Sequence, residues 1–297
     1  MPSVCFLNST IMKDSELVLA NDGSLYHIHL TGEMLADDVI LMGDPGRIDL
    51  MKEILDTVEF DIINRELRSV TGTYHGHRFT GLSTGMGCDN IDIVMTELDA
   101  AANMDLEKRC EKPEHRTLNL IRLGSCGSLQ AEIEVGTLVA SKYALGLDGL
   151  INYYDHDPAI LEEAMNRQFI AHMQFDAKLA QPYAVKGSQQ LLDSVAFDMP
   201  KVITATAPGF YGPQGRNIRI APSVKDLNER LASFEWDGTK VVNLEMETSA
   251  IYGLSRIMGH NALTICQVIA NRATGKFINE YHEKMSEALA MIMDRLS

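Results

Sequence analysis

Two short segments carry the residue types that bind an anion. Residues 43–47 read Gly-Asp-Pro-Gly-Arg, in which glycine lets the backbone approach an anion and Arg47 can donate paired hydrogen bonds to phosphate. Arg122 lies inside an apolar run, and Ser125 adds a hydroxyl just beyond it. A buried arginine must be paired, so Arg122 either binds an anion or forms an internal ion pair. Taken alone, residues 43–47 are explained equally well by an ordinary turn with a solvated arginine.

Two carboxylates stand two positions apart in Asn-Leu-Glu-Met-Glu, residues 243–247. On an extended chain Glu245 and Glu247 share a face, where they could serve a glycosidase or accept hydrogen bonds from sugar hydroxyls. Apolar residues on both sides indicate a partly buried pair rather than a solvated acidic patch.

A third kind of segment, residues 209–216, reads Gly-Phe-Tyr-Gly-Pro-Gln-Gly-Arg. Aromatic rings, an amide and a guanidinium within eight positions can stack on a planar base and hydrogen-bond its polar edge. The alternative is a surface loop with incidental aromatic residues.

Other patterns carry less chemistry. His27 and His29, like His75 and His77, are spaced as metal pairs, but no further ligands complete a set, so no metal is expected. Residues 83–87 fail the dinucleotide fingerprint because Asn90 takes the place of its third glycine. The five cysteines are odd in number and widely spaced, which predicts no disulfide framework.

The composition narrows the function classes. The chain has 297 residues, 45% of them apolar, and a formal net charge of −15, which would repel nucleic acid and anionic membranes. No run of 18 apolar residues and no signal-peptide pattern occur, so we expect a cytoplasmic protein without a membrane span.

The elements that must position these residues alternate between strands and helices. Apolar runs predict strands at residues 39–42, 78–83, 118–123, 137–143, 201–207, 241–244 and 263–270. Helical spacing predicts helices at residues 45–55, with Asp44 as N-cap, and at 90–104, 248–258 and 280–296. This order indicates an α/β fold with a largely parallel or mixed sheet. Glycine-rich turns at 43–46, 85–87 and 124–127 would then lie at the carboxyl ends of strands, where ligands bind.

In this order the segments resemble the nucleoside phosphorylase superfamily, and its uridine phosphorylases in particular, over roughly residues 25–275. The matching stretches are residues 43–47, 65–67, 83–87, 122–127, 210–216, 245–247 and 268–272. The resemblance implies a single-domain three-layer αβα fold with a central mixed sheet over residues 25–297, after an N-terminal extension at 1–24. It also implies a pentosyltransferase that reversibly converts uridine and phosphate to uracil and ribose 1-phosphate.

The resemblance assigns roles to individual positions. Expected phosphate ligands are Gly43, Arg47, Arg122 and Ser125 of one subunit, with Arg65 contributed by the neighbouring subunit. Expected ribose ligands are Thr84, Glu245, Met246, Glu247 and, lent across the dimer to the 5′-hydroxyl, His27. Expected base ligands are Phe210, which stacks, and Gln214 and Arg216, which read uracil and stabilise it as it leaves.

The resemblance also bears on base choice. Purine phosphorylases of this superfamily usually carry Ser-Asp after the last strand, whereas residues 268–272 read Val-Ile-Ala-Asn-Arg, with no aspartate. The pair Gln214 and Arg216 suits a pyrimidine, whose leaving group carries negative charge. Departures from the family pattern are Ser125 for threonine, Asp89-Asn90 for proline-serine and the order Gly212-Pro213.

The expected partners are nucleoside and phosphate, in a homodimer or trimer of dimers that shares its active sites. No resident cofactor is expected; some relatives bind a monovalent cation through a glutamate that matches Glu66, an ion we do not count among the expected ligands. A purine nucleoside phosphorylase, a hydrolytic nucleosidase, which the arginines disfavour, and a non-catalytic nucleoside-binding protein stay open as alternatives.

Overall fold

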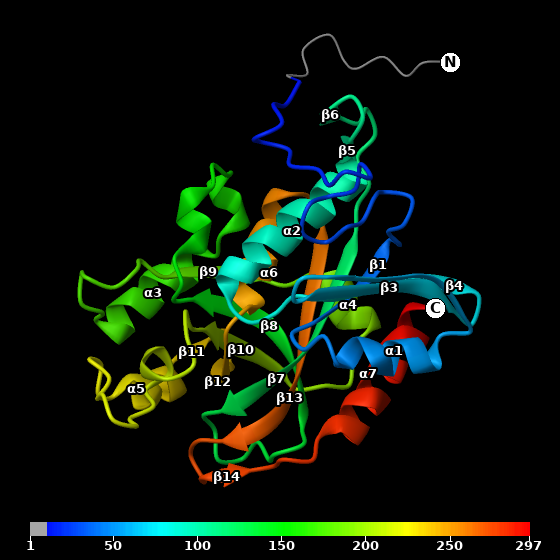
Figure 1. Ribbon diagram of the computed structural model, residues 1–297. Helices are drawn as coiled ribbons and strands as arrows, with labels where there is room; N and C mark the ends of the chain where they lie inside the picture. The colour runs from blue at the N-terminus through cyan, green and yellow to red at the C-terminus, as the bar shows by residue number, and fades with distance from the viewer. Residues whose placement is uncertain (1–10) are drawn as a thin grey trace. The chain divides into compact units, whose positions relative to one another are not determined.

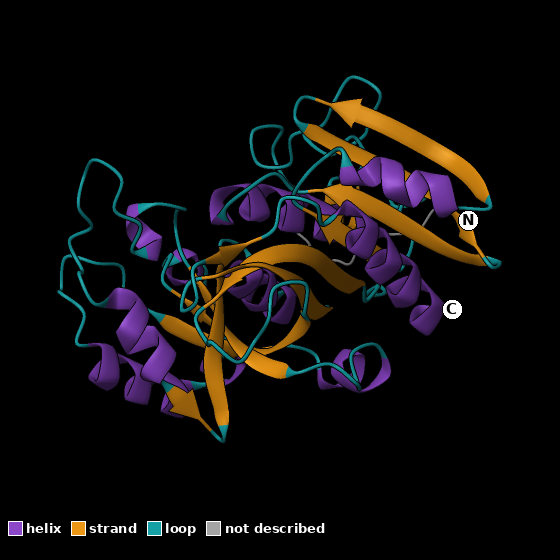
Figure 2. Cartoon of the chain, turned by 90° about the horizontal axis from the view of Figure 1, so that it is seen from below, coloured by secondary structure: helices purple, strands orange, loops and turns teal. Residues whose placement is uncertain are grey.

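The computed structural model describes residues 11–297, and its internal contacts divide them into two compact units (Figure 1). Unit 1 comprises residues up to 85, residues 93–120 and residue 297; unit 2 comprises residues 86–92 and 121–296. The first ten residues of the predicted N-terminal extension lie outside the described residues. The described chain contains both helices and strands, as the sequence predicts (Figure 2).

Unit 1 is built on four strands. They are β1 (Asp38–Met42), β2 (Thr57–Asn64), β3 (Leu67–Tyr74) and β4 (His77–Ser83), in the sheet order β1-β4-β3-β2. The buried strand β1 runs parallel to β4, whereas β2, β3 and β4 form an antiparallel meander. His75 and Gly76 connect β3 to β4 with φ of 50° and 79°, which is the hairpin turn that the sequence indicates.

Helix α1 (Arg47–Ile54) packs against β3 and β4 through buried Ile48 and Met51. Helix α2 (Cys88–Asn103) enters unit 1 at residue 93, and a two-stranded ladder of β5 (Met104–Asp105) and β6 (Cys110–Glu111) follows it. Val94, Leu98 and Ala101 are buried on one side of α2, as its apolar spacing predicts.

Unit 2 contains the remaining elements. Its strands are β7 (Asn119–Ser128, from residue 121), β8 (Leu138–Gly146), β9 (Tyr183–Lys186), β10 (Lys201–Thr206), β11 (Glu235–Trp236), β12 (Thr239–Glu245), β13 (Asn261–Asn271) and β14 (Lys276–Phe277). Its helices are α3 (Glu163–Met173), α4 (Gln189–Ser194), α5 (Leu227–Ser233), α6 (Thr248–Ile257) and α7 (His282–Leu296), with short 3-10 helices η1 (Leu150–Tyr153), η2 (Pro158–Ile160) and η3 (Gly212–Gln214).

The sheet of unit 2 is mixed and closes on itself. Its order is β11-β12-β10-β8-β13-β7, and β12 also pairs with β7, so five strands form a ring. Strand β10 is parallel to β8 and β12, whereas β13 is antiparallel to β8. The mixed sheet confirms the prediction; its closure has no signal in the sequence.

Helices cover both faces of β10. Ile203 and Ala205 pack into a core cluster with residues of α3 and α5. Thr204 and Thr206 alternate with them and point to the other face, where the Thr206 hydroxyl accepts a hydrogen bond from the backbone N–H of Ser249 in α6. This arrangement gives unit 2 the helix–sheet–helix layering that the resemblance implies.

Three local predictions were wrong. Asp44 is not the N-cap of α1, because its side chain instead accepts from the N–H of Gly46 at 2.8 Å and the helix begins only at Arg47. Residues 124–127 are not a turn, because β7 continues through them to Ser128. Cys110 is disulfide-bonded, whereas Cys88, Cys126 and Cys266 are free and buried.

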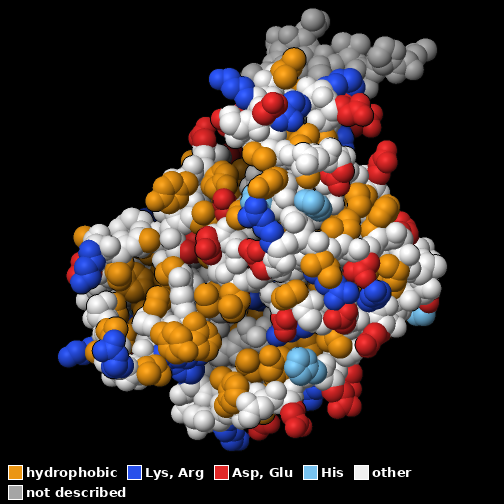
Figure 3. Space-filling model, viewed as in Figure 1, with side chains coloured by type: hydrophobic (Ala, Val, Ile, Leu, Met, Phe, Trp, Pro, Cys, Tyr) orange, Lys and Arg blue, Asp and Glu red, His pale blue; other side chains and the backbone are white. Residues whose placement is uncertain are grey.

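The surface charges and the hydropathy of the helices are those that the composition indicates. Acidic and basic side chains are interspersed on the face shown in Figure 3. Within residues 11–297 no helix is both long and apolar enough to cross a membrane.

Candidate active site

In unit 1 the turns after β1 and β4 lie side by side. The parallel pairing of Met42 with Ser83 brings the two strand ends together, and the N–H of Thr84 donates to the carbonyl of Met42 at 2.8 Å. A Cβ atom on Gly43 would lie 3.3 Å from the carbonyl oxygen of Gly85, so the two backbones leave little room for a side chain. The structure thus brings predicted ligands Gly43 and Thr84 to one edge of the sheet.

The turn after β1 leads directly into α1. The N–H of Arg47 donates to the carbonyl of Asp44 at 3.0 Å, and the Arg47 side chain is buried. Pro45, Gly46 and the exposed Arg65 line one hollow of about 280 Å³ in unit 1. Arg65 and the start of α1 are therefore neighbours within one chain, which the sequence did not indicate.

His27 and Arg65 also lie close together, and we call them the surface pair. The guanidinium of Arg65 donates to the hydroxyl of Tyr26 at 2.9 Å and lies over its ring. Asn64 donates to the backbone carbonyl of His27 at 2.8 Å. Both residues that the resemblance lends across a dimer thus belong to one cluster in unit 1.

In unit 2, Arg122 meets both predicted carboxylates, and we call Arg122, Glu245 and Glu247 the buried ion cluster. The guanidinium of Arg122 donates to Glu247 and lies 3.6 Å from Glu245. These residues are 5%, 4% and 4% exposed, so the ion pairs are shielded from water. The internal ion pair weighed for Arg122 is therefore present, and the two glutamates are not a solvated patch.

Glycines shape the buried ion cluster. A side chain on Gly124 would clash with the guanidinium of Arg122, which folds back over the strand. The N–H of Gly87 donates to Glu247 at 2.8 Å, in a backbone conformation with φ of 95° that glycine adopts readily. Arg122 and the turn at Gly87 therefore hold the Glu247 carboxylate from two sides.

The two carboxylates have different partners. Glu245 accepts from the hydroxyl of Thr206 at 2.6 Å and from the N–H groups of Glu247 and Thr248, at the start of α6. Burial raises the pKa of Glu245, the neighbouring Glu247 adds to that rise, and Arg122 opposes it. Both carboxylates are thus engaged by the protein, Glu245 through Thr206 and the start of α6, and Glu247 through Arg122, Gly87 and the N–H of Met246.

Ser125, Met246 and Cys126 complete this region. Ser125 is half-buried within β7, between buried Gly124 and Cys126, and Met246 is half-buried between the two glutamates. Burial raises the pKa of the Cys126 thiol well above its usual range, and contact with Cys266 adds to it. Cys126 is therefore an inert buried residue rather than a nucleophile.

The predicted base ligands form a compact loop in unit 2. Arg216 donates to the side-chain oxygen of Gln214 at 2.6 Å, and its guanidinium lies 3.7 Å from the centre of the Phe210 ring. Gln214 is only 3% exposed, whereas Phe210 is half exposed. The structure thus brings all three predicted base ligands together.

A second arginine, which the sequence did not single out, joins this loop. Arg272 donates to the backbone carbonyl of Gln214 at 3.2 Å. Burial, with the like charge of Arg272, lowers the pKa of Arg216 to about 10, which leaves Arg216 charged at neutral pH. Two neighbouring guanidiniums make this loop a place where negative charge is stabilised.

Asn271 ends β13, in the stretch 268–272 that contains no aspartate, and its side-chain amide is hydrogen-bonded within the protein. The amide nitrogen donates to the carbonyls of Gln130 and Ile133 at 2.8 and 2.7 Å. The amide oxygen accepts from the N–H groups of Ala273 and Thr274. This buried side chain has no group left for a base.

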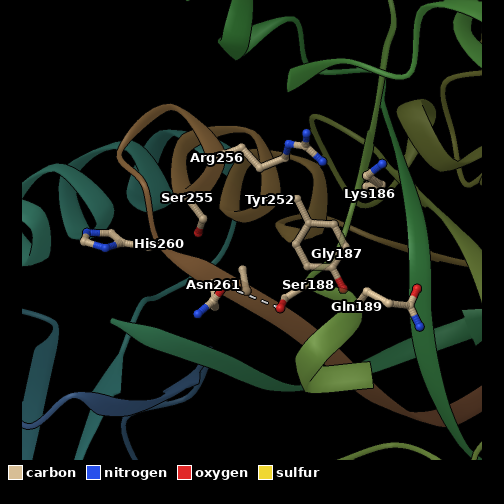
Figure 4. A pocket seen from close by; sticks show the side chains of 10 residues that line it. Lys186, Gly187, Ser188, Gln189, Tyr252, Ser255, Arg256, His260 and Asn261 are labelled. Atoms are coloured by element: carbon tan, nitrogen blue, oxygen red, sulfur yellow. Dashed lines mark hydrogen bonds between the residues drawn. The ribbon is translucent and has the colours of Figure 1, made fainter. Parts of the chain in front are cut away.

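A separate pocket of about 260 Å³ in unit 2 contains none of the predicted site residues. Figure 4 shows Tyr252, Ser255 and Arg256 of α6 together with Lys186, the last residue of β9, and Ser188 just beyond it. It is therefore not the hollow that the sequence motifs anticipate.

The sequence profile of the Phosphorylase superfamily matches residues 37–297 of this chain. The chain belongs to the phosphorylase superfamily. A uridine phosphorylase of Thermococcus kodakarensis is 30% identical over 259 residues, which cover 86% of this chain and 80% of that protein. A purine nucleoside phosphorylase of DeoD-type 1 from Vibrio vulnificus is 27% identical over 254 residues, which cover 84% of this chain and 87% of that protein.

A crystal structure of Trypanosoma brucei nucleoside phosphorylase, described as showing uridine phosphorylase activity, superposes with a TM-score of 0.83. The two chains are 28% identical, and the matched region covers 94% of this chain and 99% of that chain. The mixed α/β fold of this phosphorylase is therefore that of the nucleoside phosphorylases. Because the relatives' names include both uridine and purine enzymes, they establish the family and not the base.

Proposed function

We propose that this nucleoside phosphorylase acts on uridine and releases uracil and ribose 1-phosphate. The observation that carries the proposal is the loop in which Gln214, Arg216 and Arg272 lie together beside Phe210. An amide can bond the carbonyl and N–H edge of a pyrimidine, and two guanidiniums favour the anion that uracil becomes as it leaves.

The lack of an aspartate in residues 268–272 supports the pyrimidine over a purine. A purine leaving group gains from a proton donor at its five-membered ring, which an aspartic acid can supply. The one amide in this stretch, Asn271, makes its bonds within the protein. The named relatives from Thermococcus kodakarensis and Trypanosoma brucei agree with this choice.

Phosphate and ribose are assigned to the other residues. Gly43, Arg47, Arg122 and Ser125 bind phosphate, with Arg65 given by a neighbouring subunit. Met246, Thr84 and Glu247 hold the ribose, and His27 of the neighbouring subunit bonds its 5′-hydroxyl. Glu245 belongs to the same ribose site, and by accepting from the N–H of Glu247 it also holds that residue in place.

The reaction needs no covalent enzyme intermediate. The bond from C1′ to the base nitrogen breaks, its electron pair stays on uracil, and a phosphate oxygen forms the new bond to C1′. Arg216 and Gln214 stabilise the uracil anion, which then takes a proton from water. Catalysis comes from orientation and electrostatic stabilisation, and no resident cofactor is required.

The test compares uridine with inosine at saturating phosphate, with base release followed by absorbance. We expect kcat/KM for uridine to exceed that for inosine by at least about tenfold, because one good contact is worth 1–2 kcal/mol. A preference for inosine would replace the proposal with a purine nucleoside phosphorylase. Tight nucleoside binding without release of either base would indicate a binding protein.

A further inference from the structure

We infer that Glu97 is a positioning residue, which holds His27 in the orientation and tautomer that the ribose 5′-hydroxyl requires. The inference rests on the proposed function, in which His27 bonds that hydroxyl. Glu97 belongs to none of the segments that carry the resemblance and lies 70 positions from His27, in α2.

The carboxylate of Glu97 binds three donors, two of His27 and one of Ile28. Its Oε1 atom lies 2.6 Å from Nδ1 of the His27 ring. Its Oε2 atom accepts from the backbone N–H of His27 at 3.0 Å and from that of Ile28 at 2.8 Å. One side chain thus fixes both the ring and the backbone that carries it.

This arrangement determines which ring nitrogen faces a ligand. A carboxylate only accepts, so Nδ1 carries a proton, and Nε2 has no partner among the described residues. The Glu97 side chain is 13% exposed and that of His27 is 30% exposed, which places the carboxylate behind the ring. Nε2 is then the atom that meets the 5′-hydroxyl.

The segment is also held from its other side. Asn64 donates to the carbonyls of Tyr26 and His27 at 3.1 and 2.8 Å. The ring of Tyr26 packs edge-on against that of His27, with centroids 5.0 Å apart. All of these contacts lie within unit 1 of one chain, so His27 is ordered before any neighbouring subunit arrives.

The experiment replaces the carboxylate by its isostere, Glu97→Gln, and compares uridine with 5′-deoxyuridine. We expect kcat/KM for uridine to fall about fivefold, through KM more than kcat, because one oriented hydrogen bond is lost. With 5′-deoxyuridine, which has no 5′-hydroxyl, the variant and the parent should be equal. Glu53→Gln, at an exposed position of α1, is the matched control and should leave kcat/KM unchanged for both substrates.

The His27→Ala background provides the second readout. If Glu97 acts through His27, adding Glu97→Gln to His27→Ala should not lower kcat/KM for uridine further. The melting temperature of each variant reports any general loss of folding. An equal loss on both substrates, or an additive loss in the double variant, would overturn the inference. If the parent cleaves inosine instead of uridine, the proposed base is wrong, and inosine with 5′-deoxyinosine tests Glu97 in the same way.

Discussion

The buried ion cluster and the surface pair differ in their exposure to water and in how their side chains are held. Arg122, Glu245 and Glu247 are almost completely buried, and Arg122 is paired with both carboxylates before any ligand arrives. His27 and Arg65 keep part of each side chain in water and are held from behind by Glu97, Asn64 and Tyr26. The first arrangement suits residues that act within their own chain, and the second suits residues offered to another chain.

The difference has an energetic consequence. Removing one member of a buried, bonded charge pair leaves its partner without compensation in a site that water does not reach. Removing an exposed side chain leaves only water-accessible groups behind. Substitutions in the buried ion cluster should therefore reduce stability and activity together, whereas those in the surface pair should reduce activity alone.

The largest effect is expected for Glu247→Ala. Arg122 would lose the carboxylate it bonds, and the free energy of unfolding should fall by about 3–5 kcal/mol, measured by urea denaturation. Phosphorolysis should be lost as well. Glu53→Ala, in an exposed position, is the control, and a loss no larger than the control's would show that the cluster is not stabilised as a pair.

The next effect concerns the base loop, which is intermediate in burial. Arg216→Ala should lower kcat by about a hundredfold, because a donor that stabilises the leaving anion is removed. Arg219→Ala, at an exposed position three residues on, is the matched control and should leave kcat unchanged. Equal kcat values for the two variants would show that Arg216 does not take part in the reaction.

Arg47→Ala tests the turn that first suggests a phosphate site. Loss of a charge-assisted contact should cost about 1.5–3 kcal/mol, or one to two decades in kcat/KM for phosphate. The dependence of the rate on phosphate concentration measures it. If the variant had the kinetics of the parent, residues 43–47 would be an ordinary turn and not a phosphate site.

The smallest effect is expected for His27→Ala. Its ring is partly exposed, so the melting temperature should stay within a degree or two of the parent's, whereas kcat/KM for uridine should fall about fivefold. Thermal denaturation and steady-state kinetics on one preparation give both values. A large drop in melting temperature would place His27 with the structural residues.

The sequence predicts those parts of the site that are local in the chain. Gly43 and Arg47 stand in one turn, Glu245 and Glu247 on one strand end, and Gln214 and Arg216 in one loop. Each group is recognisable because a few neighbouring residues hold all of its chemistry. The mixed α/β fold follows in the same way from apolar runs that alternate between strand and helix spacing.

What the sequence does not predict depends on distant contacts. Glu97 looks like a solvated residue of an amphipathic helix, and only the fold brings it to His27. Strand β2 is not among the predicted strands, although Val58, Phe60 and Ile62 alternate with polar residues; none of its side chains is fully buried, and Ile63 is 71% exposed. Residues 124–127 look like a turn because they are small, yet Gly124 is small so that Arg122 can fold over the strand.

The most direct test of the central claim is uracil release from uridine with and without inorganic phosphate, with ribose 1-phosphate quantified in the same samples. We expect uracil to be released only with phosphate, and one ribose 1-phosphate to form for each uracil. Equal release without phosphate, with free ribose as the product, would contradict that claim.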